Sequence, residues 1–217
     1  MLHYLIAAGV AVLTGGASAE PAQTQFRMAG VNFIVPLPDG YCLPTGKDID
    51  VSQAMAAADS ENVTHAMLVR CDNDELMDYY ILKTPKQVMM AQVSMADFLS
   101  AMGEAFANPA MKKLIHGDEI EKVVERDLNA VLGTKVDFVG EIKPLGQDDQ
   151  CAYLGGIGDF SNIPKPYKIA IGACMTVVSN KVITVYSYGP RTDQVGVINE
   201  LKKAHNLAAE ISATPAL

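Results

Sequence analysis

Runs of apolar residues, broken by short polar segments, predict the strands of this chain. In the C-terminal half these runs are rich in Val, Ile and Tyr, and Gly, Pro, Asn or Asp residues bound them, as expected for strands. They cover residues 136–142, 151–157, 167–178 and 182–188. Because consecutive strands with short turns pair side by side, this half predicts an antiparallel meander. The same signals predict earlier strands at residues 31–35, 64–71 and 77–84.

A helical period is clearest after Ser94, a residue that suits the N-cap of a helix. Apolar residues then recur at spacings of three and four, so they share one face of the predicted helix. They are Met95, Phe98, Leu99, Met102 and Phe106. Residues 118–132 repeat this pattern with negative charge in the first turn, and Gly133 is placed to end that helix.

Three further helices are predicted. Residues 50–58 form a short helix that begins at an aspartate cap, and residues 108–117 form another that begins with Asn-Pro and ends at Gly. The last helix begins at Thr192, and residues 212–217 beyond it are expected to fray. Helices beside an antiparallel sheet predict an α+β fold, in which the helices pack on the sheet as an α/β sandwich. Residues 20–217 have the length of a single domain.

The N-terminal segment predicts export. Residues 2–13 are almost all apolar, and the small residues Ala17-Ser18-Ala19 follow, so residues 1–19 are typical of a signal peptide cleaved between Ala19 and Glu20. The segment has no Lys or Arg before its apolar run, which leaves open an uncleaved anchor or a start codon placed a few residues late. No later stretch is long and apolar enough to span a bilayer, so we expect no stable membrane insertion after cleavage. The expected location is periplasmic or secreted.

The net charge of the chain indicates which classes of partner it is expected to bind. The chain has 25 acidic and 17 basic residues and a formal net charge of −8. Nucleic acids and anionic membranes attract proteins through Lys and Arg, so this balance disfavours both as partners. An envelope protein or a small ligand is the expected partner.

The four cysteines predict two disulfides, because an even number in an exported chain is typical of a disulfide framework. Three pairings are open, and we favour Cys42–Cys71 and Cys151–Cys174. If the strands at 151–157 and 167–178 form a hairpin centred near residues 162–163, Cys151 faces Cys174 at a distance that a disulfide can bridge. Metal ligation by four thiolates would need close pairs such as C-x-x-C, which the sequence lacks.

The segment from Phe33 to Tyr41 (FIVPLPDGY) resembles the opening strand, proline-glycine turn and aromatic residue of the Mog1/PsbP-like superfamily. The predicted final hairpin and C-terminal helix fit that superfamily too. The resemblance implies the α+β sandwich fold and a non-catalytic accessory or binding role. It supplies no catalytic residue, and the cysteines and residues 109–132 have no counterpart in it.

Candidate reactive groups have ordinary structural interpretations. His65, His116 and His205 stand outside any metal or catalytic motif. The Gly-rich residues 155–159 are expected to end a strand in a bulge or turn, and the acidic residues at 72–78 to form a solvated turn that lacks the spacing of a calcium loop. Met89, Met90, Met95 and Met102 crowd one region, but Met95 and Met102 fall on the apolar stripe of a helix, where methionine is ordinary core filler rather than a copper ligand. We expect no catalytic residue, metal or cofactor.

Tyrosines are the best candidates for a binding surface. Tyr186 and Tyr188 share one face of a predicted strand, and with Tyr153 they could line a groove for a ligand or partner. Packing between neighbouring strands explains them equally well.

The sequence therefore predicts an exported, non-catalytic binding or accessory protein. Two alternatives remain. The first is an envelope hydrolase that uses carboxylates brought together by the fold. The second is an inhibitor of an extracellular enzyme that acts through residues 159–166, a loop that the expected Cys151–Cys174 disulfide would brace.

Overall fold

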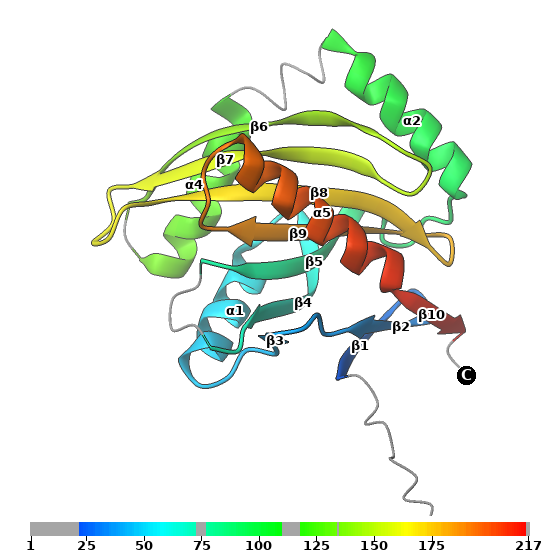
Figure 1. Ribbon diagram of the computed structural model, residues 1–217, viewed down its shortest axis with the longest axis horizontal. Coiled ribbons are helices and arrows are strands. Elements are labelled where there is room, and N and C mark those ends of the chain that lie inside the picture. Colours follow the sequence, from blue (N-terminus) through cyan, green and yellow to red (C-terminus); the bar gives the residue numbers. More distant parts are fainter. Residues whose placement is uncertain (1–21, 73–76, 110–117, 134, 216–217) are drawn as a thin grey trace, which may run out of the picture.

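A seven-stranded antiparallel sheet forms the centre of the molecule in the computed structural model, which describes residues 22–72, 77–109, 118–133 and 135–215 (Figure 1). The predicted signal peptide and its cleavage site lie outside these residues. The spatial order of the strands is β3-β4-β5-β9-β8-β7-β6. Their bounds are β3 Tyr41–Cys42, β4 Asn62–Arg70, β5 Tyr79–Pro85, β6 Asp137–Gln147, β7 Ala152–Ser161, β8 Tyr167–Val178 and β9 Lys181–Gly189. The last four strands are the predicted antiparallel meander.

A second, three-stranded sheet joins the two ends of the described chain. Its central strand β2 (Val31–Pro36) pairs with β1 (Gln23–Met28) on one side and with β10 (Ser212–Pro215) on the other. The prediction that residues 212–217 fray is wrong for residues 212–215, because Ser212 to Pro215 pair along β2 from Ile34 to Val31. β1 was not predicted, since its mostly polar sequence lacks the apolar pattern of a strand.

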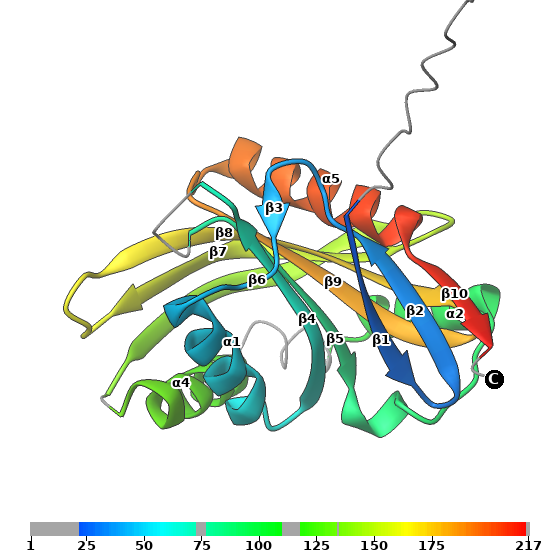
Figure 2. The same cartoon turned by 90° about the horizontal axis from the view of Figure 1, so that it is seen from below.

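Helices cover both faces of the large sheet (Figure 2). α5 (Gln194–Glu210) packs on β8 and β9 from one face, whereas α1 (Lys47–Ala58), α2 (Met95–Ala107) and α4 (Asp118–Leu132) lie on the other. A short 3-10 helix, η1 (Lys86–Val88), follows β5. This arrangement is the expected α+β sandwich. No helix among the described residues is long and apolar enough to cross a membrane.

Helix ends follow the sequence signals in part. The predicted cap at Asp50 is wrong, because α1 begins at Lys47 after Gly46, which places Asp50 inside the first turn. The Ser94 side chain accepts a hydrogen bond from the Asp97 N–H, which confirms the predicted cap of α2. α5 is capped by Asp193 rather than by Thr192, because the Asp193 carboxylate accepts from the Gly196 N–H. The short helix predicted at residues 108–117 falls mostly outside the described residues, as does His116.

Both predicted disulfides are present. The Cα atoms are 5.2 Å apart in Cys42–Cys71 and 5.3 Å apart in Cys151–Cys174. The expected register was wrong, however, because Tyr153 rather than Cys151 lies opposite Cys174. The register differs by two residues, which is the side-chain period of a strand, so Cys151 still points to the same face as Cys174.

The Gly-rich residues 155–159 do not form the expected bulge or turn. They lie inside β7, which pairs with β6 and β8 as far as Phe160 and on to Ser161 on the β6 side. A Cβ atom at Gly156 would stand 1.8 Å from the Glu141 carbonyl oxygen, so this glycine allows β6 and β7 to approach. Strand β7 therefore continues where the sequence suggested a loop.

Candidate functional site

A cavity of about 280 Å³ opens between α5 and the ends of β6 and β7. Both apolar and polar side chains line it. The apolar members are Leu145, Ile198 and Leu201, and the polar members are Asp148, Tyr153, Lys202, His205 and Asn206. Leu145 and Ile198 are 40% and 42% exposed, so apolar surface borders this recess. We call this recess the α5–β7 cavity.

Three polar side chains of this cavity form one hydrogen-bonded cluster. The Tyr153 hydroxyl donates to Asp148 Oδ2 at 2.5 Å and lies 2.7 Å from His205 Nδ1. Because the phenol has a single proton and gives it to Asp148, its oxygen must accept from a protonated Nδ1 of His205. His205 Nδ1 is also 3.8 Å from Asp148 Oδ2. We call Asp148, Tyr153 and His205 the polar triad.

Backbone contacts hold Asp148 in its ionised form. Its Oδ1 accepts from the N–H groups of Gln150 at 2.9 Å and Cys151 at 2.8 Å. Burial alone would raise the pKa of Asp148, but the bonds from Tyr153 and these N–H groups outweigh burial and lower it. Burial and the neighbouring carboxylate also raise the pKa of the Tyr153 phenol above its ordinary value. The cluster is therefore a carboxylate bonded to a neutral phenol.

Rigid elements position the triad. Tyr153 stands on β7 opposite Cys174, and the Cys151–Cys174 disulfide fixes the start of that strand. His205 is carried by α5, which lies so close to β8 that a Cβ atom at Gly172 would be 2.3 Å from the Leu201 nitrogen. Because β8 pairs with β7, this contact sets the distance between the helix and Tyr153.

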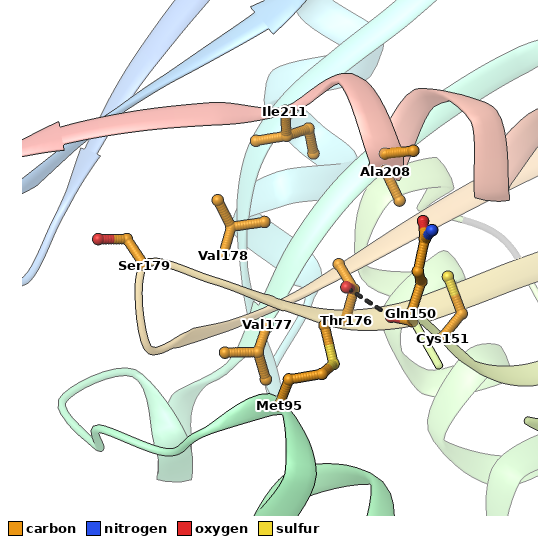
Figure 3. A pocket seen from close by; sticks show the side chains of 10 residues that line it. Met95, Gln150, Cys151, Thr176, Val177, Val178, Ser179, Ala208 and Ile211 are labelled. Carbon is orange, nitrogen blue, oxygen red and sulfur yellow. Dashed lines mark hydrogen bonds between the residues drawn. The ribbon is translucent and has the colours of Figure 1, made fainter. Parts of the chain in front are cut away.

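A second cavity, of about 310 Å³, lies farther along α5 toward its C-terminal end (Figure 3). It is lined by uncharged residues: Met95, Gln150, Cys151, Thr176, Val177, Val178, Ser179, Ala208, Ala209 and Ile211. The Thr176 hydroxyl that faces it is occupied by a 2.8 Å bond to the Gln150 carbonyl. Charged side chains are therefore absent from its described lining, and it offers less chemistry than the α5–β7 cavity.

Two carboxylates are buried among the described residues, and each is paired. Asp59 accepts from Lys83 at 2.6 Å. Burial alone would raise the pKa of Asp59, but the bonds from Lys83 and Asn62 lower it. Glu200 accepts from the Ser187 hydroxyl at 2.5 Å and from Lys203 at 3.1 Å.

These two carboxylates lie on opposite faces of the large sheet. Lys83 pairs with Thr184 and lies near the Tyr186 ring, whereas Ser187 points to the α5 face. The sheet separates Asp59 from Glu200, so they do not form the carboxylate pair that the hydrolase alternative requires.

The three candidate tyrosines do not share a surface. Tyr153 lies opposite Cys174 and Cys174 opposite Val185, so these residues face α5. Tyr186 and Tyr188 follow on the other face, where Tyr188 stacks on Tyr79 with ring centroids 4.4 Å apart. Burial and the charge of Asp59 raise the pKa of Tyr186 to about 12. That Tyr186 or Tyr188 contacts a ligand stays a prediction, whereas Tyr153 lines a cavity.

The remaining candidates have structural partners. His65 stacks on Phe26, and its Nε2 is 3.0 Å from the Thr84 hydroxyl. Asp72 pairs with Arg70, and Asp78 pairs with Lys203. Asp74 and Glu75 lie outside the described residues, and Met95 and Met102 pack in a hydrophobic cluster around Phe98.

The hairpin loop proposed as an inhibitory segment is shorter than expected. Residues 159–161 belong to β7, so only residues 162–166 connect it to β8. The Cys151–Cys174 disulfide lies near the opposite end of this hairpin and does not brace the loop. Ile163 instead packs against the hydrophobic cluster on the face of the sheet opposite α5.

Sequence reasoning missed two of the three residues in the polar triad. His205 stands outside any motif in the sequence, and Asp148 falls between the strands predicted at residues 136–142 and 151–157. Tyr153 and His205 are 52 residues apart, and no local motif links them. The one local signal is the short spacing from Asp148 to Cys151, which suits an aspartate that binds the N–H groups after it.

Comparison with known proteins adds a likeness in fold. No family model and no curated protein matches the sequence. The solution structure of cyanobacterial PsbP (CyanoP) from Synechocystis is similar, with a TM-score of 0.40 and 10% identity over 92% of this chain and 96% of that one. The crystal structure of LpqN from Mycobacterium tuberculosis, described as involved in cell envelope biogenesis, has a TM-score of 0.32 and 14% identity over 91% and 93%. The first of these structures carries the name PsbP, as does the superfamily that residues 33–41 resemble.

Proposed function

We propose that this chain is an exported binding protein without catalytic activity, and that its ligand or partner occupies the α5–β7 cavity. Two disulfides support export, because such bonds persist in oxidising compartments and are rare in the cytosol. The predicted signal peptide agrees with this location. The partner is an envelope protein or a small ligand that reaches this surface.

The cavity itself is the observation that carries the proposal. Binding sites in proteins combine apolar walls with a few convergent polar groups. Here Leu145 and Ile198 remain exposed beside the hydrogen-bonded triad, so a ligand could bury the apolar side chains and bond to the polar ones. Burying exposed apolar area stabilises a complex by about 25 cal/mol per Å² before the entropy of association is subtracted.

The paired state of the buried carboxylates favours binding over hydrolysis. A retaining or inverting glycosidase holds its two carboxyl groups about 5–9.5 Å apart across one cleft. Asp59 and Glu200 are instead separated by the sheet, and each is occupied by a lysine. The Asp148 carboxylate has a lowered pKa, which suits recognition better than proton donation.

The test compares two substitutions of exposed apolar residues by glutamate. Ile198→Glu places a charge in the apolar wall of the cavity, and Val139→Glu makes the same change on β6 outside the cavity lining. Each purified variant is immobilised and exposed to an envelope extract. Bound proteins are identified by mass spectrometry, and bound small molecules are detected by native mass spectrometry.

The expected result is one partner or bound mass that the wild type and Val139→Glu share and that Ile198→Glu loses. Equal capture by all three proteins would contradict the cavity as the binding site. No specific partner or bound mass with any of them would contradict the binding function.

A further inference from the structure

We propose that the polar triad binds a divalent transition-metal ion of the zinc type, with Asp148, Tyr153 and His205 as its ligands. The inference builds on the proposed function, because the ion would lie at the wall of the α5–β7 cavity. It assigns a role to the most concentrated group of donor atoms on this surface.

The distances within the triad are close to those of a metal site. Tyr153 Oη is 2.5 Å from Asp148 Oδ2 and 2.7 Å from His205 Nδ1, and the last two atoms are 3.8 Å apart. Ligand atoms bound to zinc at about 2.0–2.2 Å in a tetrahedron are separated by about 3.3 Å. Shifts of about 1 Å or less would therefore admit an ion, and these side chains lie at an open cavity wall.

The triad has the supporting bonds that metal ligands need. The second oxygen of Asp148 accepts two backbone N–H bonds, which hold the carboxylate in orientation. Tyr153 and His205 are fixed by β7 and α5, whose mutual distance is set at Gly172. An imidazole nitrogen with carboxylate and phenol oxygens is a donor set that suits zinc and its neighbours in the first transition row.

Cys151 is close but cannot be a ligand. Its sulfur is 3.7 Å from His205 Nδ1, so Asp148, Cys151 and His205 group together by distance. That sulfur is bonded to Cys174, and a disulfide has no thiolate to bind an ion. Tyr153 takes the third position instead, and the fourth is open to the cavity for water or a ligand atom.

The local charge suits a cation. Asp148 and Asp149 together place negative charge beside the Tyr153 phenol. Lys202 also lines the cavity from α5 and opposes this charge, but among the described residues it forms no ion pair with Asp148.

Binding would release one proton. The Tyr153 O–H bond breaks, its oxygen bonds to the ion, and the proton passes to the solvent. His205 keeps its single proton, which moves from Nδ1 to Nε2 so that Nδ1 can bind. Charge and atoms balance without any oxidant or reductant.

The test uses the exported protein without a polyhistidine tag. Zn²⁺ binding is measured by calorimetry in two buffers of different ionisation enthalpy, and Co²⁺ binding by visible absorption. We expect one ion per chain, a d–d spectrum of four- or five-coordinate Co²⁺, and release of about one proton per Zn²⁺. Tyr153→Phe, His205→Gln and Asp148→Asn should each weaken Zn²⁺ binding by at least about tenfold.

Matched controls make the same chemical changes elsewhere. Tyr186→Phe lies on the opposite face of the sheet, and Asp159→Asn removes an exposed carboxylate of β7. Both should bind Zn²⁺ like the wild type, and urea unfolding identifies any variant that fails to fold. Absence of Zn²⁺ binding, or equal binding by the wild type and all three triad variants, would overturn the proposal. Ligand capture that persists in a chelator would then leave the binding function standing without its metal.

Discussion

At the scale of single residues, burial decides the chemistry of His65. Its ring stacks on Phe26, which belongs to the small sheet, while the residue itself stands on β4 of the large one. The Thr84 hydroxyl donates to the Val182 carbonyl, so its oxygen accepts the proton of His65 Nε2. Burial lowers the pKa of His65 to about 4. This histidine is therefore neutral and joins the two sheets.

The pH dependence of stability should report this residue. The folded pKa of about 4 lies below the ordinary value of 6.5, so the unfolded chain binds more protons between these pH values. His65 should therefore contribute its full stability above pH 6.5 and lose up to about 3 kcal/mol as the pH falls to 4. Urea unfolding of wild type and His65→Gln across this range measures the difference. Parallel curves for the two proteins would contradict it.

At the scale of elements, α4 protects the free edge of β6. The backbone N–H groups of Val136, Phe138 and Gly140 donate to the side chains of Asn129, Glu125 and Glu121, at 2.6, 3.0 and 3.2 Å. These acceptors are four residues apart and so form one stripe of the helix. The outward N–H groups of an edge strand would otherwise invite pairing with another chain.

Removing the Glu121 and Glu125 side chains should destabilise the folded protein and expose the edge of β6. The double variant Glu121→Ala/Glu125→Ala leaves two N–H groups without partners, and we expect a loss of about 2–4 kcal/mol together with self-association. Alanine favours helix, so helix propensity does not explain a loss. Urea unfolding and light scattering measure the two effects. Glu104→Ala, an exposed change on α2, is the control, and equal behaviour of both variants would refute the role of α4.

At the scale of the whole molecule, the two disulfides protect different regions. Cys42–Cys71 ties β3 to the end of β4 at the sheet edge, and Cys71 is exposed. Cys151 and Cys174 are 1% and 0% exposed, beneath α5. A disulfide that closes a loop of this size stabilises a protein by roughly 3–4 kcal/mol in the chain-entropy model.

Mild reduction should therefore open the two disulfides at different rates. A dithiol added to the folded protein should open Cys42–Cys71 first, because its attack needs access to a sulfur, and Cys151–Cys174 only as the protein unfolds. Alkylation followed by peptide mass mapping identifies the opened pair over time. Equal rates for both pairs, or earlier opening of Cys151–Cys174, would show that exposure does not control reduction here.

Local sequence patterns predicted most of the helices and strands and the class of the fold. Apolar runs located the meander, since strands buried on both faces leave a continuous apolar pattern, and Ser94 and Gly133 bounded helices through local caps. The sequence also predicted the cysteine pairs correctly, because a two-residue error in register leaves the side chains of Cys151 and Cys174 on the same face of the sheet.

The position of the polar triad depends on contacts between elements that are distant in sequence. β10 forms because its backbone pairs with that of β2, a strand that is distant in sequence. The register of β7, β8 and β9 places Tyr153 on one face of the sheet and Tyr186 and Tyr188 on the other. Packing of α5 on Gly172 brings His205 to Tyr153 and Asp148. Local patterns encode which face a side chain takes, whereas contacts between distant elements depend on packing that no short segment records.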